Sequence, residues 1–165
     1  MLPLNEETFE RVARSLPQWA RASAEAGWAA FDSLPMPDSH QEEWRYVEVD
    51  VDLAALHLPE TAGAPLPAAR SLVAGLDSPA GRAVNVDGRT VAVAAGDGVG
   101  LSSLAAGVAG DGEAVRRAFR SGPPPGLDRF SAAHHAFAAD GVFLHLAPGH
   151  SPAGPLHLGI CHVER

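Results

Sequence analysis

Lysine is absent from this 165-residue chain, and cysteine occurs once, as Cys161. Its twelve strongly basic side chains are all scattered arginines, and the formal net charge is -8 at pH 7. Such a chain has no basic stripe that could neutralise a phosphate backbone, which argues against nucleic acid as a partner. A single cysteine cannot form an intrachain disulfide, so nothing indicates an oxidising compartment and we expect a cytoplasmic protein.

Long apolar runs are missing as well. No stretch reaches the roughly 18 apolar residues that a membrane helix needs. The first residues, MLPLNEETFERV, carry acidic side chains where a secretory signal carries positive charge. The sequence therefore predicts no membrane association. A hydrophobic content of 46% with 19% charged residues is nevertheless typical of a globular protein with a core.

The spacing of apolar residues predicts two helices near the start of the chain. Asn5 suits an N-cap, and residues 9–16 then follow the helical period. A second apolar stripe covers residues 20–31, and Pro35 with Pro37 ends it.

Turn and linker signals follow in the middle of the chain. The stretch 59–71 is rich in Pro, Ala and Gly without periodicity, and we interpret it as a linker. Two β-branched runs, 83–86 and 90–93, flank Asp87-Gly88, which predicts a β-hairpin. The glycine-rich stretch 94–103 lacks the lysine of a phosphate-binding loop and the spacing of a dinucleotide fold, so we interpret it as a plain loop.

Helices and strands alternate towards the end. We expect one helix over 111–120, closing with three arginines, and another from Asp128 to Gly141. Strands are predicted at 142–146 and 156–163. Because an unpaired final strand is an aggregation hazard, we expect either a truncated chain or a partner that supplies the next strand. The same edge allows self-association into a homo-oligomer.

The fold class is therefore expected to be α+β. We divide the chain into an N-terminal helical region, a linker, a small α/β region and the beginning of a β structure, at residues 1–58, 59–71, 72–127 and 128–165.

Histidines concentrate near the end of the sequence. Strand alternation places His145 on the face of Phe143, and His157 on the face of Cys161, so a metal site of these residues with His162 is conceivable. No CxxC, HxH or HExxH spacing is present, and we therefore favour packed or surface histidines. The alternative is a stand-alone, cupin-like metal-binding β protein that uses His145, His157, Cys161 and His162.

Trp44, Arg45 and Tyr46 form a different kind of candidate. Two large aromatic rings bracket an arginine directly after Glu42 and Glu43. Both rings could pack while the arginine pairs with a carboxylate or stacks on a ring. We interpret the three residues as a structural anchor.

Residues 34–56, LPMPDSHQEEWRYVEVDVDLAAL, resemble the N-terminal signature of the SufB/SufD family of iron–sulfur cluster assembly proteins. In that signature a Leu-Pro segment leads to an acidic pair and then to Trp-Arg-Tyr. Residues 17–35 and 82–107 are similar to the family's preceding helix and to its strand-turn-strand segment. Residues 130–158 resemble the helix and "DG" that enter its β-helix.

The resemblance is closest to SufD, and it implies that residues 128–165 begin a right-handed parallel β-helix. It also implies SufB and SufC homologues as partners, and an iron–sulfur cluster in the intact complex, with no cofactor in this part. No catalytic residue of the family maps onto the sequence. We therefore expect a scaffold region that works through protein–protein assembly, and not an enzyme.

Overall fold

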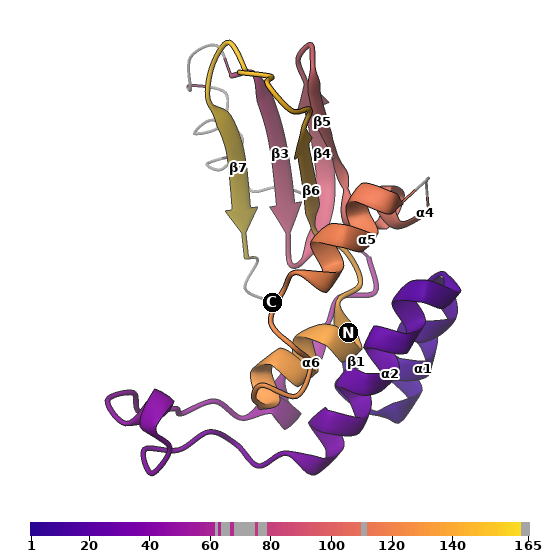
Figure 1. Ribbon diagram of the computed structural model, residues 1–165. Helices are drawn as coiled ribbons and strands as arrows, with labels where there is room; N and C mark the ends of the chain where they lie inside the picture. Colours follow the sequence, from indigo (N-terminus) through magenta and orange to yellow (C-terminus); the bar gives the residue numbers. More distant parts are fainter. Residues whose placement is uncertain (62, 64–66, 68–74, 76–78, 110–111, 163–165) are drawn as a thin grey trace. The chain divides into compact units, whose positions relative to one another are not determined.

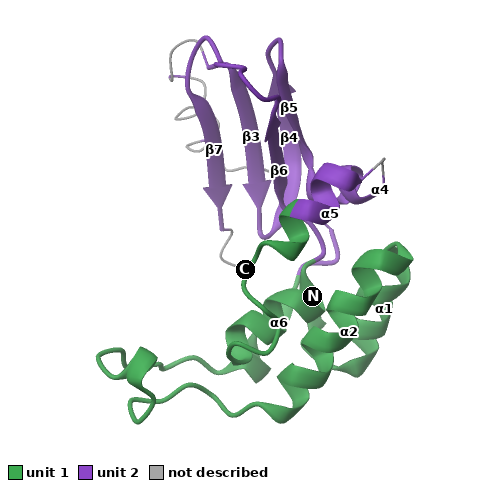
Figure 2. Ribbon diagram, viewed as in Figure 1, with its two compact units in different colours: residues 1–58, 118–138 green, residues 59–117, 139–165 purple. Residues whose placement is uncertain are grey.

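The structure is a computed structural model, and it describes residues 1–61, 63, 67, 75, 79–109 and 112–162. It is a mixed α+β fold with small open sheets (Figure 1). The chain divides into two compact units (Figure 2). Unit 1 comprises residues 1–58 and 118–138, and unit 2 comprises residues 59–117 and 139–165.

Unit 1 is helical. Its elements are β1 (Leu2–Pro3), α1 (Glu6–Ser15), α2 (Gln18–Ser33), the short 3-10 helices η1 (Glu42–Trp44) and η2 (Leu53–Ala55), β2 (His57–Leu58) and α6 (Arg129–Phe137). The Asn5 side chain accepts a hydrogen bond from the Thr8 amide at 3.0 Å, which confirms the predicted N-cap of α1. Asp128 caps α6 in the same way, by accepting from the Ser131 amide at 2.7 Å. α6 ends at Phe137, earlier than the Gly141 stop that we predicted.

The core of unit 1 lies where α2 and α6 face each other. Phe31 and Phe137 meet edge to face with ring centroids 5.5 Å apart, and Leu53 joins this buried cluster. Gly27 allows the close approach of the two helices. A Cβ at this position would lie 2.6 Å from the Cβ of His135, so no larger residue fits without movement.

Unit 2 is built from strands. Its sheets comprise β3 (Gly81–Val86), β4 (Arg89–Ala95), β5 (Val99–Ser103), β6 (Val142–Leu146) and β7 (Leu156–Cys161), and α4 (Leu104–Ala109) follows β5. One sheet has the order β4-β3-β7, and β5 pairs with β6 in the other. β3 and β4 are antiparallel, whereas β3 and β7 are parallel with Gly81 opposite Leu156. The helix α5 (Glu113–Arg120) is divided between the units after Arg117.

The β3–β4 turn confirms the predicted hairpin. Asp87 and Gly88 both have positive φ angles, 51° and 79°, as a two-residue turn of type I′ requires. The adjoining prediction for residues 94–103 was wrong, because Val99–Ser103 forms β5 and pairs with β6. This strand contains Gly100 and two serines, so its propensity is low, and only pairing with β6 makes it a strand.

The units also differ from the contiguous ranges predicted from the sequence. The division at residue 58 coincides with the first predicted boundary, but α6 belongs to unit 1 and not to the C-terminal region 128–165. The strands on either side of α6 belong to the same unit 2. Of the predicted linker 59–71, residues 62, 64–66 and 68–71 lie outside the described residues, as does the end of the last predicted strand at residue 163.

Candidate functional site

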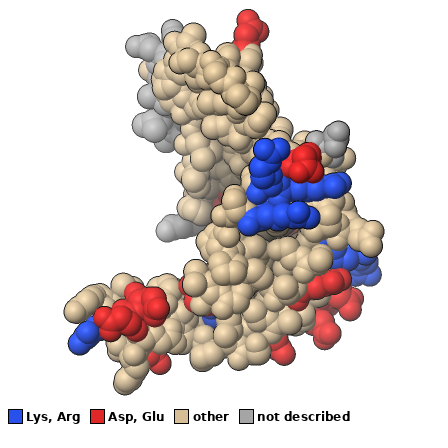
Figure 3. Space-filling view, in the orientation of Figure 1, with Lys and Arg blue, Asp and Glu red and all other residues tan. Residues whose placement is uncertain are grey.

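The most exposed segment of unit 1 is residues 38–52, which we call the acidic arm. It carries six carboxylates and one arginine, and all seven of these side chains are exposed. The acidic residues are Asp38, Glu42, Glu43, Glu48, Asp50 and Asp52. Figure 3 shows the resulting concentration of acidic side chains. The arm has little regular structure beyond η1, so its backbone and side chains are available to a partner.

The acidic arm is attached to unit 1 at two points. The rings of Trp44 and Phe130 on α6 lie 5.7 Å apart. Asp52 accepts from the Ala54 amide at 2.9 Å and so begins η2, which delivers Leu53 into the core. The arm is therefore tied down at its middle and at its end, while the residues between these points face solvent.

Of the predicted anchor residues, the structure separates Trp44 from Tyr46. Trp44 contacts α6, but the Tyr46 side chain is 89% exposed, so the expectation that both rings pack was wrong. The Arg45 guanidinium lies 3.4 Å from a Glu42 carboxylate oxygen and 5.7 Å from the centroid of the Tyr46 ring. Both of these interactions are on the surface, where they contribute little to stability. Tyr46 is consequently available for binding.

The arm folds around a concavity of about 560 Å³. Its lining combines apolar side chains with charges of both signs, and comprises Pro37, Asp38, Ser39, Arg45, Tyr46, Val47, Glu48 and Val49. Val47 and Val51 of the arm are also largely exposed. Exposed apolar groups rimmed by charges are typical of a protein interaction surface.

The histidines on α6 have a structural role. His135 is buried, and its Nε2 donates to the Pro123 carbonyl at 2.8 Å while its Nδ1 accepts from the Ser23 hydroxyl at 2.9 Å. This tautomer follows because a carbonyl can only accept. Partial burial lowers the pKa of His134, and repulsion from His135 lowers it further.

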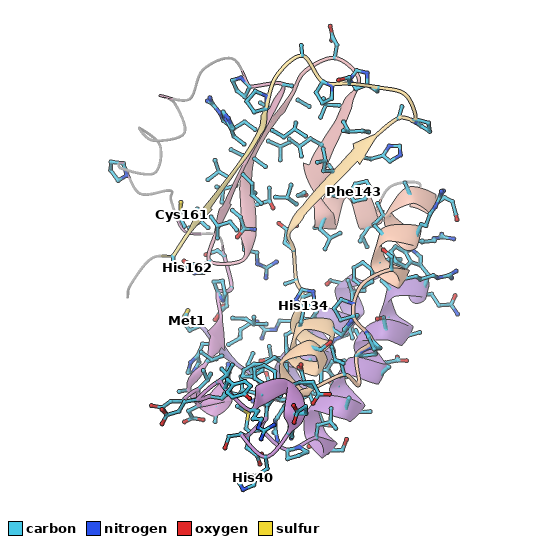
Figure 4. The ribbon with its side chains drawn as sticks, turned by 60° about the vertical axis from the view of Figure 1, so that its left-hand side comes forward. Met1, His40, His134, Phe143, Cys161 and His162 are labelled. Carbon is cyan, nitrogen blue, oxygen red and sulfur yellow. The ribbon has the colours of Figure 1, made fainter. Side chains whose placement is uncertain are left out.

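The C-terminal residues of the alternative metal site lie in different sheets. His145 is exposed on β6 and its ring stacks on Phe143, which confirms that these two share a face. His157 and Cys161 lie on β7, in the other sheet, with His162 exposed just after it (Figure 4). Within the described part of the chain, no group of three or more His, Cys, Asp or Glu side chains could hold a metal ion. The described residues likewise contain no helix long and apolar enough to cross a membrane.

Asp140 is a residue whose importance sequence reasoning did not identify. One carboxylate oxygen accepts from the Thr90 amide at 2.8 Å, and the other accepts from the Ala105 amide at 3.0 Å. The Thr90 hydroxyl donates to the next carbonyl, that of Gly141. Asp140 thus joins β4, the start of α4 and the entry to β6. The only signal in the sequence was the "DG" of the family resemblance.

Comparison with known proteins adds no relative: no family model matches the chain, and no curated protein matches it in sequence.

Proposed function

We propose that this chain is the N-terminal portion of a SufB/SufD-type scaffold, closest to SufD, and that it acts through protein–protein assembly and not through catalysis. The signature in residues 34–56 supports the proposal, because its Trp-Arg-Tyr lies in the exposed acidic arm. Trp44 attaches this segment to α6, and Tyr46 is exposed to solvent, so the segment is suited to recognising a partner.

The observation that carries the proposal is the parallel pairing of β3 with β7. Six consecutive residue pairs, from Gly81 with Leu156 to Val86 with Cys161, are in register without a bulge. Parallel neighbours need a long crossover, and here about 70 residues separate the two strands. Strands of successive coils pair in parallel in a β-helix, and β7 lies within residues 128–165, for which the resemblance implies the beginning of that fold. β3 precedes this region and has the antiparallel strand β4 on its other edge.

The outer face of β7 supports the same interpretation. Leu158 and Ile160 are 54% and 64% exposed, and β3 is the sole strand partner of β7 among the described residues. An exposed edge with apolar side chains and no charge is unfavourable for an isolated sheet. A further coil would pair with this edge and cover both side chains.

The inferred partners are SufB and SufC homologues in the cytoplasm, with the iron–sulfur cluster assembled in the intact complex. In this arrangement the chain contributes a binding surface and no chemical group.

Co-purification tests the proposal. The chain is co-expressed with SufB and SufC homologues of the same organism, and the complex is analysed by size exclusion with light scattering. We expect co-elution, and we expect Tyr46→Ser to weaken it without changing thermal stability, since the ring is exposed. Leu127→Ser is the matched control, because it removes another exposed apolar side chain of unit 1 outside the signature.

Failure of the unmodified chain to bind either homologue would overturn the proposal. Elemental analysis of the same untagged preparation tests the alternative function, a stand-alone metal-binding β protein. Stoichiometric metal that is lost on replacing His157 and Cys161, combined with no binding to the homologues, would favour a stand-alone metal-binding protein.

A further inference from the structure

Arginines gather on one helix of this acidic chain. Arg116, Arg117 and Arg120 lie within the eight residues of α5 and are all exposed, with Glu113 as the only acidic residue of the helix. Figure 3 shows the corresponding group of basic side chains on the surface. The spacings i, i+3 and i, i+4 place these like charges next to one another on the helix surface.

The other face of α5 is occupied by internal packing. Val115 is buried, and the Phe119 ring meets the Trp19 ring edge to face with centroids 5.8 Å apart. Val115 and Phe119 lie one turn apart on one side of the helix, and the three exposed arginines occupy the remaining surface. Arginines at the end of a helix suit the macrodipole, but the exposed Arg117 and Arg120, which are one helical turn apart, also repel each other. An anionic partner would relieve that repulsion.

The acidic arm has the complementary surface. Glu43, Glu48 and Asp50 are exposed and form no hydrogen bond or ion pair with any of the described residues. Exposed apolar side chains, Tyr46 and Val47, lie among them, so the arm could also bury apolar area on contact.

We propose that the acidic arm of one copy binds the arginine face of α5 in a second copy. Each copy carries both surfaces, so a second copy of the chain offers the complementary charge to each of them. This inference does not depend on the SufB/SufD assignment, because it rests only on charges and exposures within the chain. The contact consists of guanidinium–carboxylate pairs at the surface and is therefore sensitive to salt.

Sedimentation velocity over a range of protein concentrations, in low salt and in about 1 M NaCl, where the screening length is about 3 Å, is the first test. We expect a reversible monomer–dimer equilibrium that weakens by roughly tenfold or more at high salt, because several exposed ion pairs contribute. A chain that stays monomeric at every concentration in low salt would overturn the proposal.

Charge reversal identifies the surfaces. The arm variant is Glu43→Arg, Glu48→Arg and Asp50→Arg, and the helix variant is Arg117→Glu and Arg120→Glu. Each variant alone should be monomeric, because its arm and its helix then carry the same sign. An equimolar mixture should dimerise again, because the reversed arm of one variant meets the reversed helix of the other.

A matched control is Glu25→Arg, Asp32→Arg and Asp97→Arg, which changes the net charge as the arm variant does, at exposed positions outside both surfaces. It should dimerise like the unmodified chain, and circular dichroism should show that all variants remain folded. If both reversed variants still self-associate, or if their mixture stays monomeric, the arm does not bind α5 of a second copy.

Discussion

The helical unit and the sheet unit differ in how far they bury large apolar side chains on their helices and strands. In unit 1, Phe31 and Phe137 are almost fully buried between α2 and α6. In unit 2, the fully buried strand residues are Ala83 and Val86, whereas Leu158 and Ile160 on β7 are largely exposed. Two helices that pack together bury the apolar stripe of each helix. A sheet has two faces and two edges, and each needs a further layer or strand to cover it. The sheet unit and the arm are therefore where partners are expected.

The largest effect on stability is predicted for a substitution at the contact between α2 and α6. Gly27→Val would place a branched side chain 2.6 Å from the His135 Cβ and 2.7 Å from the Ala136 backbone nitrogen. We expect a loss of about 3 kcal/mol or more in unfolding free energy, because backbone must move to make room. Urea denaturation followed by circular dichroism measures it.

The matched control for that change is Ala29→Val, at an exposed position of the same helix. It should cost less than about 1 kcal/mol, which is the propensity difference alone. Equal costs for the two variants would show that α2 and α6 do not pack as closely as described.

In the sheet unit the largest single effect is expected at Asp140. Asp140→Ala leaves the amides of Thr90 and Ala105 without their acceptor, and should lower the unfolding free energy by about 2 kcal/mol. Asp140→Asn keeps one acceptor oxygen and should cost about half as much. Asp97→Ala, at an exposed turn, serves as the control and should change stability by less than about 0.5 kcal/mol. A similar value for all three variants would contradict the bridging role of Asp140.

Substitutions on the exposed edge strand β7 should change self-association of the chain and leave its stability nearly unchanged. Leu158→Lys with Ile160→Lys should leave the unfolding free energy within about 1 kcal/mol, because both side chains are largely exposed. It should reduce any salt-insensitive self-association through this strand, since charges on an edge strand block pairing. Light scattering at high salt provides the measurement, with Leu127→Lys in unit 1 as the control. Unchanged association would exclude the β7 edge as a self-contact.

The smallest predicted effect concerns pH in the helical unit. The pKa of His134 is lowered in the folded state, so protonation is less favourable there than in the unfolded chain. Stability from this group is therefore present above the unfolded pKa of about 6.5 and decreases as the pH falls below it. His134→Gln should reduce the loss of thermal stability between neutral and mildly acidic pH, by a small amount because the ring is partly solvated.

His162→Gln is the control for this comparison, since the residue is exposed after β7 and lies outside the helical unit. Both variants remove one imidazole, so the difference between their pH profiles measures the contribution of the His134 environment. An identical pH dependence of the unmodified chain and the His134 variant would contradict the lowered pKa.

Local signals in the sequence determined the elements whose formation depends on neighbouring residues. Asn5 and Asp128 are short polar side chains that cap helices within one turn, and Asp87-Gly88 supplies the two positive φ angles of the hairpin. The shared face of Phe143 and His145 followed from strand alternation alone. Each of these is fixed by interactions over a few residues, so periodicity and capping residues were sufficient.

Tertiary structure alone decided the features that join distant parts of the chain. β5 is a strand because β6 pairs with it, and α6 belongs with α2 because Gly27 lets the two backbones approach. The position of Tyr46 in solvent and the bridging contacts of Asp140 depend in the same way on where remote segments lie. Contacts between residues far apart in sequence leave no local period or propensity, and for that physical reason only the folded structure reveals them.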